Sequence, residues 1–246
     1  MKKVVLITGA SRGIGAGIAR IFANNGYNIV LNYNNSEKEA FALANELESI
    51  TEVLVVKCDV SKEQEVVNMV NVAVKRFGKI DVLINNAGIS IDKLFAEKTP
   101  EDFRRTFDTN VIGAFMVSKL VGEIMAGNRW GRIINISSTN GINTYFPMCA
   151  DYDASKAAIN SLTHNLAVQF APYVNVNAIA PGFIGTENEL SAMDEEFIDY
   201  EKEKIMVKRI GTVEDVANLA LFLASDNASF INNEIIRIDG GTYGAC

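Results

Sequence analysis

Seven short apolar runs rich in β-branched residues recur along the chain, and a longer stretch with helical spacing follows most of them. Runs that stay apolar along their whole length are typical of strands buried on both faces of a sheet. The runs span residues 3–8, 28–33, 53–58, 80–85, 132–137, 174–180 and 234–239. The helical stretches span about residues 14–25, 36–50, 62–77, 101–127, 152–171 and 212–225.

This alternation predicts an α/β fold with a seven-stranded parallel sheet, right-handed crossovers and helices on both faces. No Pro/Ser-rich linker divides residues 1–246, so we expect a single domain. Residues 183–210 break the rhythm, because they are strongly charged and intervene between the sixth strand and the last helix. A segment at that edge can cover a site, so we predict a small helical lid there. A solvated helical hairpin is the alternative.

The charge and the polar composition narrow the function. A formal charge of −7 disfavours binding to nucleic acid or to an anionic membrane. His164 is the only histidine, so we expect neither a Ser-His-Asp triad nor a metal site. No run is long and apolar enough for a signal peptide or a membrane span, which predicts a cytoplasmic protein.

A glycine-rich turn, TGASRGIG at residues 8–15, follows the first strand and opens the first helix. In such a turn Gly9 permits the tight bend, Gly13 lets the backbone approach a pyrophosphate, and Gly15 lets the helix pack close to the sheet. The pyrophosphate then meets the positive N-terminus of the helix. A tight turn without a ligand is the alternative, but the strand before it and the helix after it favour a dinucleotide site of the Rossmann type.

The end of the second strand carries no acidic residue. A site for NAD places a carboxylate there to bind the ribose 2′-hydroxyl. Tyr33 holds that place, flanked by Asn32 and Asn34, and Glu37 follows too late. We therefore predict NADP(H) as the cofactor, with NAD(H) as the alternative.

Two further features support a 2′-phosphate. The stretch 36–39, SEKE, has the pattern of a capping box with Ser36 as N-cap, and the free amides of that helix N-terminus can accept a phosphate. Arg12, just before Gly13, adds a cation near the same pocket.

Tyr152 and Lys156 stand four residues apart in DYDASKAA, residues 151–158, so a helix places them on one face. A neighbouring ammonium lowers the pKa of a tyrosine from its usual value of ~10. A general acid works best when its pKa lies near the operating pH. The pair therefore has a chemical rationale as a proton donor, although chance pairs of this kind are common.

Two more polar residues belong with this pair. Ser138 ends the fifth strand at the edge that carries the glycine turn, and Ser137 points elsewhere because side chains alternate along a strand. Ser138 can donate to a substrate carbonyl or, alternatively, cap the backbone. Asn110 lies inside the predicted helix 101–127, where asparagine is a mediocre residue. A helix-surface position is the alternative for Asn110.

Together these motifs resemble the short-chain dehydrogenase/reductase family, and the resemblance covers nearly the whole chain. The glycine turn is similar to the family's TGxxxGxG, and INNAG is similar to its NNAG. The matching segments are residues 8–15, 84–88, 180–186 and 238–241, with the tetrad Asn110, Ser138, Tyr152 and Lys156.

The resemblance implies the reduction of a carbonyl to a secondary alcohol, or the reverse. Tyr152 would give a proton to the developing alkoxide, and Lys156 would bind the nicotinamide ribose and lower the tyrosine pKa. Ser138 would orient the carbonyl, and Asn110 would hold a water that links the lysine to solvent.

The resemblance also implies contacts with the cofactor. Asp59 and Val60 would hold the adenine, and Ile184 and Thr186 would meet the nicotinamide carboxamide. The alternative for Asp59 is a turn residue, and for Val60 a core residue. The predicted cofactor set is Gly9, Ser11, Arg12, Gly13, Ile14, Gly15, Asn32, Tyr33, Asn34, Ser36, Asp59, Val60, Asn86, Ala87, Gly88, Tyr152, Lys156, Pro181, Gly182, Ile184 and Thr186.

Within the family the chain looks most like the 3-oxoacyl-(acyl-carrier-protein) reductases, which implies an acyl-thioester substrate in fatty acid synthesis. A carrier protein is acidic and needs a basic docking patch. Arg129 and Arg132 offer charge, but residues 169–178 lack the arginine usual in this subgroup, so docking of an acyl carrier protein stays open.

Two other functions remain open. The bulky segment 142–150 suits a ring-containing substrate as well as a thioester, so a dehydrogenase of a steroid, sugar or other small secondary alcohol is the alternative. A non-catalytic cofactor-binding sensor ranks below it, because all four tetrad residues are present. The resemblance implies a homotetramer built on helices 101–127 and 152–171 and on the last strand.

Overall fold

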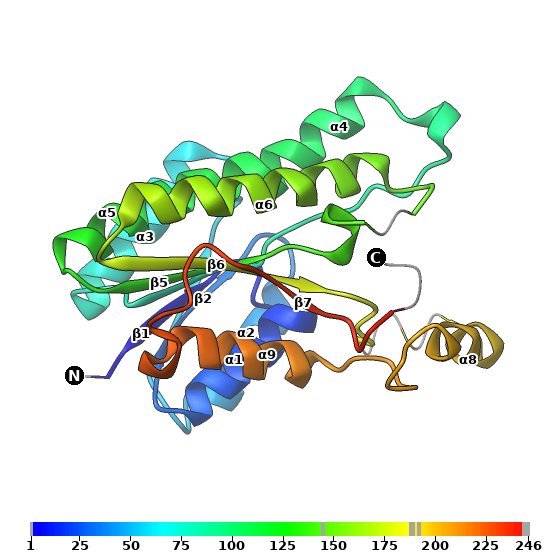
Figure 1. Ribbon diagram of the computed structural model, residues 1–246. Coiled ribbons are helices and arrows are strands. Elements are labelled where there is room, and N and C mark those ends of the chain that lie inside the picture. Colours follow the sequence, from blue (N-terminus) through cyan, green and yellow to red (C-terminus); the bar gives the residue numbers. More distant parts are fainter. Residues whose placement is uncertain (1, 144–145, 187–189, 191–192, 243–246) are drawn as a thin grey trace.

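Seven parallel strands lie side by side in the order β3-β2-β1-β4-β5-β6-β7 in the computed structural model, which describes residues 2–143, 146–186, 190 and 193–242 (Figure 1). Val5 of β1 is in register with Ile29 of β2 on one side and with Val82 of β4 on the other. The predicted seven-stranded parallel sheet is confirmed. The strands are β1 (Val4–Ile7), β2 (Asn28–Tyr33), β3 (Val53–Lys57), β4 (Val82–Asn85), β5 (Gly131–Ile136), β6 (Val174–Pro181) and β7 (Ile235–Ile238).

Burial along the strands explains the apolar runs. Every residue of β1, β2, β4 and β5 is buried, whereas β3 and β7, at the two edges, are partly exposed. Helices cover both faces of the sheet, so alternate side chains enter two apolar layers instead of one layer and solvent.

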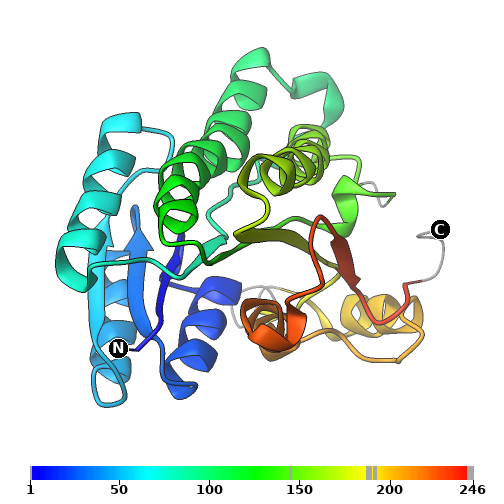
Figure 2. The ribbon, with the colours of Figure 1, turned by 60° about the vertical axis from the view of Figure 1, so that its left-hand side comes forward.

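Each face of the sheet has its own helical layer (Figures 1 and 2). Phe22 and Leu223 belong to the core of one layer, and Met125 and Phe170 to the core of the other. The first layer contains α1 (Gly13–Asn24), α2 (Glu37–Leu47) and α9 (Val213–Ala224). The second contains α3 (Glu63–Phe77), α5 (Ala114–Gly127) and α6 (Ala150–Phe170). Two further helices, α4 (Pro100–Phe107) and α8 (Glu195–Glu203), lie beyond the carboxyl ends of the strands (Figure 1).

The helix predicted at residues 101–127 contains a π-helical turn. Asp108–Gly113 has π geometry and joins α4 to α5 without a break. The helix passes close to the loop after β3 at this point, because a Cβ on Gly113 would lie only 2.9 Å from Val60 Cγ2. Such turns are rare and frequent at functional sites. This one carries Asn110.

The continuous helix Pro100–Gly127 is long and apolar enough, by length and composition alone, to cross a membrane. The expectation that no run has that character was therefore wrong. Its apolar residues Val117, Val121 and Met125 are fully buried in the core between α5 and the sheet. Packing in the core accounts for its composition.

The segment predicted as a lid contains α8. Phe197 of α8 packs edge to face on Phe183 of the loop after β6, with 6.3 Å between ring centroids. Ile205 then forms an antiparallel bridge with Thr242. The helical character expected of this segment is confirmed for Glu195–Glu203, and residues 187–189 and 191–192 lie outside the described part. Its role as a lid stays a prediction.

Gly122→Ala should destabilise the fold, because α5 and α6 are in contact at this glycine. A Cβ on Gly122 would lie 2.4 Å from two ring atoms of Phe170. Overpacking of this kind costs about 1–3 kcal/mol. Gly127→Ala is the matched control on the same helix, because a Cβ there would meet nothing within 4 Å. Thermal denaturation should show a lower Tm for Gly122→Ala only, and equal Tm values would contradict the close contact.

Candidate active site

The glycine turn between β1 and α1 has the geometry that its sequence predicts. Gly9 and Gly13 adopt φ values of +61° and +54°, a region that favours glycine. A Cβ on Gly15 would lie 2.5 Å from Gly9 O and 2.6 Å from Asn86 Nδ2, so only glycine fits. The first-turn amides of α1 lack intrahelical acceptors and face outward with the positive end of the helix dipole. The turn therefore has the form that a phosphate site requires.

Asn86 joins this turn to the end of β4. Its Nδ2 donates to Thr8 O (3.0 Å) and to Gly9 O (2.9 Å). Thr8 Oγ1 in turn accepts from the backbone N–H groups of Asn86 and Ala87, each at 3.0 Å. A Cβ on Gly9 would lie 2.9 Å from Ala87 Cα. The NNAG segment is therefore held against the glycine turn, as its predicted place beside the cofactor requires.

Asn32, predicted as a cofactor contact, uses its buried side chain inside the protein. Its Oδ1 accepts from Gly9 N (3.1 Å), and its Nδ2 donates to Cys58 O (3.0 Å) and Tyr33 O (3.2 Å). The amide fixes the glycine turn to the ends of β2 and β3. Its support of the cofactor site is indirect.

The predicted 2′-phosphate pocket differs from expectation in two respects. Tyr33 is buried and donates to Glu37 Oε1 (3.2 Å), so a carboxylate lies closer to the end of β2 than its position in the sequence suggests. Burial and this carboxylate raise the pKa of Tyr33. Ser36 is the N-cap of α2, but its ψ of 64° departs from the extended N-cap conformation and its side chain makes no capping hydrogen bond. The predicted capping box is therefore wrong. Arg12 and Asn34 are exposed, as a pocket for a phosphate requires.

Asp59 and Val60, at the end of β3, also serve the fold. Asp59 Oδ1 accepts from Ser61 N (3.0 Å) and Ser61 Oγ (2.8 Å), which is a turn of the kind named as its alternative. Val60 is buried in the core beside Gly113. Contact of either residue with an adenine ring stays a prediction.

Tyr152 and Lys156 lie on α6, with Lys156 Nζ 5.3 Å from the centroid of the Tyr152 ring. Lys156 is 5% exposed, and Nζ donates to Ile136 O of β5 at 2.7 Å. Burial lowers the pKa of Lys156 to about 8. At neutral pH the ammonium is still protonated, so it can favour the phenolate form of the tyrosine.

Asn110 is buried, not on the helix surface. Its Oδ1 accepts from Ile89 N (2.8 Å), and its Nδ2 donates to Ile89 O (3.0 Å) and Ser155 Oγ (2.9 Å). Asn110 and Lys156 both lie close to Gly88, because a Cβ there would lie 3.4 Å from Asn110 Oδ1 and 3.7 Å from Lys156 Nζ. The structure thus brings these two tetrad residues close to one glycine, and the water relay stays a prediction.

Ser138 and Ser137 point in different directions, as strand alternation predicts. Ser137 Oγ donates to Asn160 Oδ1 (2.6 Å) beneath α6. Ser138 Oγ accepts from Asn140 N (3.2 Å), and Asn140 Nδ2 donates to Asp153 Oδ1 (2.6 Å) beside Tyr152. Asn140 thus links Ser138 to Asp153, the residue that follows Tyr152 in α6.

The segment after β6 closes the other side of the site. A Cβ on Gly13 would lie 3.5 Å from Thr186 Cγ2, so Thr186 lies over the glycine turn. Gly182 packs on Asp239, because a Cβ there would meet Asp239 Cβ at 2.5 Å. Ile184 is buried and forms a bridge with Gly211. Pro181 ends β6.

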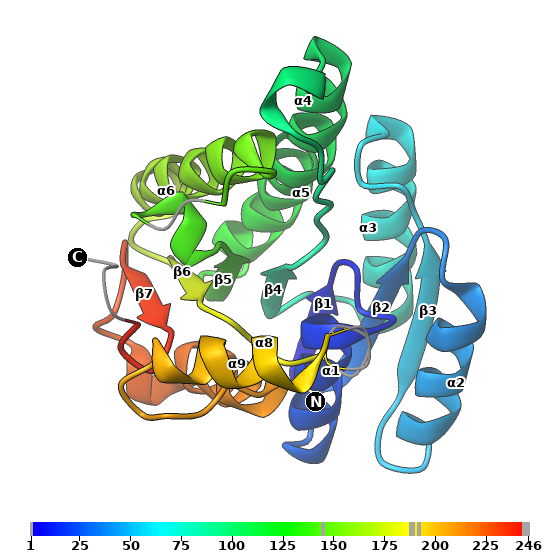
Figure 3. The ribbon, with the colours of Figure 1, turned by 90° about the vertical axis from the view of Figure 1, so that its right-hand side faces the viewer.

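The glycine turn, the NNAG segment, Ser138 and the segment after β6 follow the carboxyl ends of strands, and these ends face the viewer in Figure 3. The sheet order changes direction between β1 and β4, and ligands of open α/β sheets bind in the crevice at such a point. The glycine turn and the NNAG segment flank this point. The Tyr152–Lys156 pair follows β5 on the same edge.

Comparison with known proteins agrees with this geometry. The family model described as enoyl-(acyl carrier protein) reductase matches residues 9–243. The chain belongs to the short-chain dehydrogenase/reductase family. It is 39% identical over 245 residues to the 3-oxoacyl-[acyl-carrier-protein] reductase FabG of Staphylococcus epidermidis, covering 99% of this chain and 100% of that protein. It is 37% identical to the acetoacetyl-CoA reductase of Rhizobium meliloti, covering 99% of each chain.

Solved structures of other family members have the same fold. The crystal structure of the 3-oxoacyl-[acyl-carrier protein] reductase of Brucella melitensis matches with a TM-score of 0.90 at 32% identity, covering 98% of this chain and 91% of that one. The structure of ElxO with NADP bound matches with a TM-score of 0.89 at 36% identity, covering 98% of each chain. The protein is thus an oxidoreductase of this family that acts on a carbonyl or an alcohol with a nicotinamide cofactor.

Arg132 and Arg129, the two arginines considered for docking a carrier protein, have different surroundings in the structure. Arg132 is buried, and its guanidinium lies 4.7 Å over the Trp130 ring, so it offers no docking charge. The Arg129 guanidinium lies 5.8 Å over the ring of Tyr173, which belongs to the segment 169–178 without an arginine. Both precede or begin β5 and therefore lie at the sheet edge opposite the crevice.

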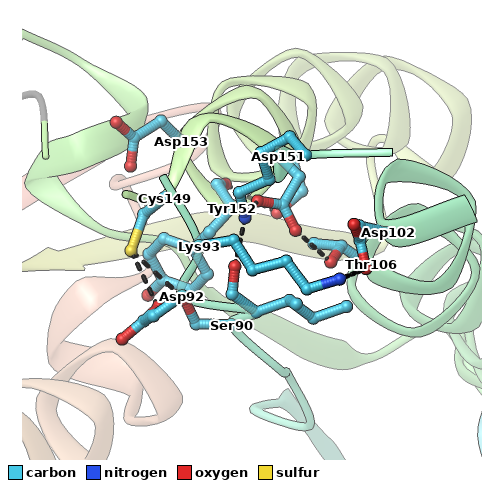
Figure 4. A network of polar contacts seen from close by, with 12 residues as sticks. Ser90, Asp92, Lys93, Asp102, Thr106, Cys149, Asp151, Tyr152 and Asp153 are labelled. Atoms are coloured by element: carbon cyan, nitrogen blue, oxygen red, sulfur yellow. Dashed lines mark hydrogen bonds and ion pairs between the residues drawn. The ribbon is translucent and has the colours of Figure 1, made fainter. Parts of the chain in front are cut away.

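The sequence did not predict the polar network around Tyr152 (Figure 4). Cys149 begins it: its buried thiol lies 3.0 Å from Asp92 Oδ1, and burial raises the thiol pKa to about 11, which makes Cys149 a poor nucleophile. Asp151 and Asp153 each bind partners on other elements. The one available signal was the unusual pair of carboxylates on either side of a predicted catalytic tyrosine.

Lys156→Met should stabilise the fold while abolishing turnover. The folded pKa of about 8 lies below the ordinary 10.5, so burying the ammonium opposes folding at neutral pH. At ~1.4 kcal/mol per pKa unit, and allowing ~1 kcal/mol for the lost hydrogen bond to Ile136 O, the gain should be roughly 2 kcal/mol.

The pH dependence follows from the same values. Between about pH 8 and pH 10.5 the unfolded chain binds a proton that the folded chain does not, so wild-type stability rises with pH. The advantage of the variant should therefore be largest below pH 8 and shrink above it. Denaturation in the absence of cofactor measures both, and a variant less stable than wild type at pH 7 would contradict the cost assigned to this ammonium.

Proposed function

We propose that this protein is an NADP(H)-dependent reductase, organised as one domain, that converts the carbonyl of a 3-oxoacyl thioester to a secondary alcohol. The observation that carries the proposal is the buried Lys156 ammonium beside the Tyr152 ring, at the edge of the crevice that the glycine turn opens. The resemblance to 3-oxoacyl-[acyl-carrier-protein] reductases and to an acetoacetyl-CoA reductase supports the thioester as substrate.

The chain's residues fit a dinucleotide. The cradle formed by Gly9, Gly13 and Gly15 would take the pyrophosphate, since the turn leads into the N-terminus of α1 with Gly9 and Gly13 at positive φ. Asn86, Ala87 and Gly88 would lie along the cofactor, and Thr186 would cover it. When bound, the nicotinamide supplies a hydride to the carbonyl carbon.

The side chains around the carbonyl manage its proton. Ser138 Oγ accepts from Asn140 N and donates to Asn140 Oδ1 over a long 3.4 Å, and the carbonyl oxygen of the substrate would replace Asn140 Oδ1 as the acceptor. Tyr152 gives its phenolic proton to the same oxygen as charge develops there. Lys156 stabilises the phenolate that remains. Asn110 binds Ile89 and Ser155, which fixes the loop after β4 to α6.

The preference for NADP(H) over NAD(H) is part of the proposal. Arg12 is exposed at the N-terminus of α1, and its guanidinium makes no hydrogen bond or ion pair with any residue that the structure describes. Glu37, the carboxylate that follows the end of β2, accepts from the Tyr33 hydroxyl. An exposed cation at the glycine turn and a carboxylate that is already engaged both favour a 2′-phosphate. The homologous structure of ElxO holds NADP.

A second candidate is a dehydrogenase of a steroid, sugar or other small secondary alcohol. The observation that favours it is the weak basic patch, because Arg132 is buried and residues 169–178 contain no arginine. The exposed Phe146 offers an apolar side chain to a ring. Tyr145 lies outside the described residues.

Assembly and location remain proposals as well. Ile112, Phe115 and Val168 are exposed apolar residues on the π turn, α5 and α6, the elements expected to form a homotetramer interface. A cytoplasmic location stays a prediction.

Tyr152→Phe should abolish carbonyl reduction and leave NADPH binding unchanged, because only the phenolic oxygen is lost. The measurement is NADPH oxidation followed optically with an acetoacetyl thioester, in parallel with ring ketones and steroids. A loss of about 10²-fold or more in kcat is expected for a general acid. Turnover of a ring ketone alone would favour the second candidate. Equal turnover of variant and wild type would refute the proposed proton donor.

Arg12→Ala should raise KM for NADPH about ten-fold and leave KM for NADH unchanged, because a charge-assisted contact with a phosphate contributes about 1.5–3 kcal/mol. Lys75→Ala, which removes an exposed cation in the last turn of α3, away from this pocket, is the matched control. An equal effect on both cofactors would show that Arg12 does not bind the 2′-phosphate.

A further inference from the structure

Two hydrogen bonds join α6 to the helix that carries Asn110. On each helix the two residues that form these bonds are four positions apart. Thr106 Oγ1 donates to Asp151 Oδ2 at 2.5 Å, and Asn110 Nδ2 donates to Ser155 Oγ at 2.9 Å. Thr106 and Asn110 are four residues apart, as are Asp151 and Ser155. Since residues four apart share one face of a helix, the two contacts are successive cross-links between facing sides.

Each cross-link lies one residue before a member of the Tyr152–Lys156 pair. Asp151 precedes Tyr152, and Ser155 precedes Lys156. One residue turns a helix by about 100°, so the face that is cross-linked and the face that carries the pair have a fixed angle between them. The cross-links therefore set the rotation of α6 that directs Tyr152 and Lys156 toward the crevice.

Asp151 can hold this position because its charge is balanced inside the protein. Asp151 is fully buried, and the side chain of Lys98 is 3% exposed. Lys98 Nζ donates to Asp151 Oδ1 and to Ile91 O. Burial raises the pKa of Asp151, but the hydrogen bonds from Lys98 and Thr106 outweigh it, so the pKa lies below its usual value and the carboxylate is charged. Both carboxylate oxygens are engaged.

The loop before α4 contacts the start of α6 at further points (Figure 4). Lys93 N donates to Met148 O at 3.2 Å, and the thiol of Cys149 donates to Asp92 Oδ1 at 3.0 Å. In Figure 4 the labelled carboxylate of Asp151 lies beside Thr106, away from the labelled Asp153. The first turn of α6 is thus held from one side by α4 and its preceding loop.

We propose that Asp151, bound by Thr106 and Lys98, is a positioning residue that sets the orientation of Tyr152 for proton transfer. The inference rests on the proposed carbonyl reduction. A buried ion pair stabilises a fold little better than apolar residues of the same volume do. Three polar groups at this point are therefore better explained by the geometry that they fix than by the stability that they add.

The test compares two threonines with buried hydroxyls. Thr106→Val removes the donor to Asp151 Oδ2 and keeps the shape of the side chain. The matched control is Thr163→Val, farther along α6, which removes a hydroxyl that accepts from Asn135 Nδ2 (2.8 Å) and donates to Ile159 O (2.8 Å). Both should lose thermal stability to a similar extent.

Only Thr106→Val should lose catalysis. Small misplacements of a reacting group cost up to 10²-fold in rate, so kcat for the acetoacetyl thioester should fall about ten-fold or more. KM and the Kd for NADPH should stay within about two-fold of wild type, because neither binding surface changes. Thr106→Ser keeps the hydroxyl and should restore kcat. Thr163→Val should keep a wild-type kcat.

Two results would overturn the inference: a wild-type kcat in Thr106→Val, or equal losses of kcat in Thr106→Val and Thr163→Val. Failure of the proposed function is distinguishable, since wild type and Tyr152→Phe would then turn over the panel of carbonyl compounds equally or not at all. If wild type is active and Tyr152→Phe is inactive, the threonine variants test the positioning role by itself.

Discussion

The close approach of the β1 and β4 ends is the constraint on which the rest of this structure depends. The Asn86 side chain donates to the carbonyls of Thr8 and Gly9, and the Thr8 hydroxyl accepts from the amides that follow β4. No Cβ fits on Gly9 or Gly15 between them. This contact sets the depth of the crevice at the switch in strand order. It also directs the N-terminus of α1 toward the crevice, where a dinucleotide phosphate can meet its free amides.

The buried Lys156 ammonium in the crevice lowers the stability of the fold and serves the proposed reaction. An ammonium has three N–H donors, and among the described residues Lys156 uses one, to Ile136 O. Burial lowers its pKa, so burying the charged form opposes folding. A buried ammonium with free N–H donors destabilises a core. In a site the same donors can bind ribose hydroxyls and a phenolate. Conflicts between local rules and the fold are expected at functional sites.

Much of this arrangement could be predicted from the sequence because it rests on local patterns. Apolar runs gave the strands, glycine spacing gave the turn, and the four-residue spacing gave the shared face of Tyr152 and Lys156. The failures depend on contacts between distant segments. The side chain of Asn32 turns inward to Gly9 and Cys58, and Glu37 bends back to Tyr33. Nothing local to Lys98 indicates its partner, which lies 53 residues further along the chain.

The π turn at Asp108–Gly113 has a consequence for how this fold can vary. One extra residue in a helix rotates everything before it by about 100° relative to everything after it. The α5 side keeps its apolar stripe on the sheet, while the α4 side presents Thr106 to α6. The π turn therefore sets the rotation between the face of α4 that contacts α6 and the face of α5 that packs on the sheet. Substitutions in α4 can therefore alter the surface near the crevice without changing how α5 packs on the sheet.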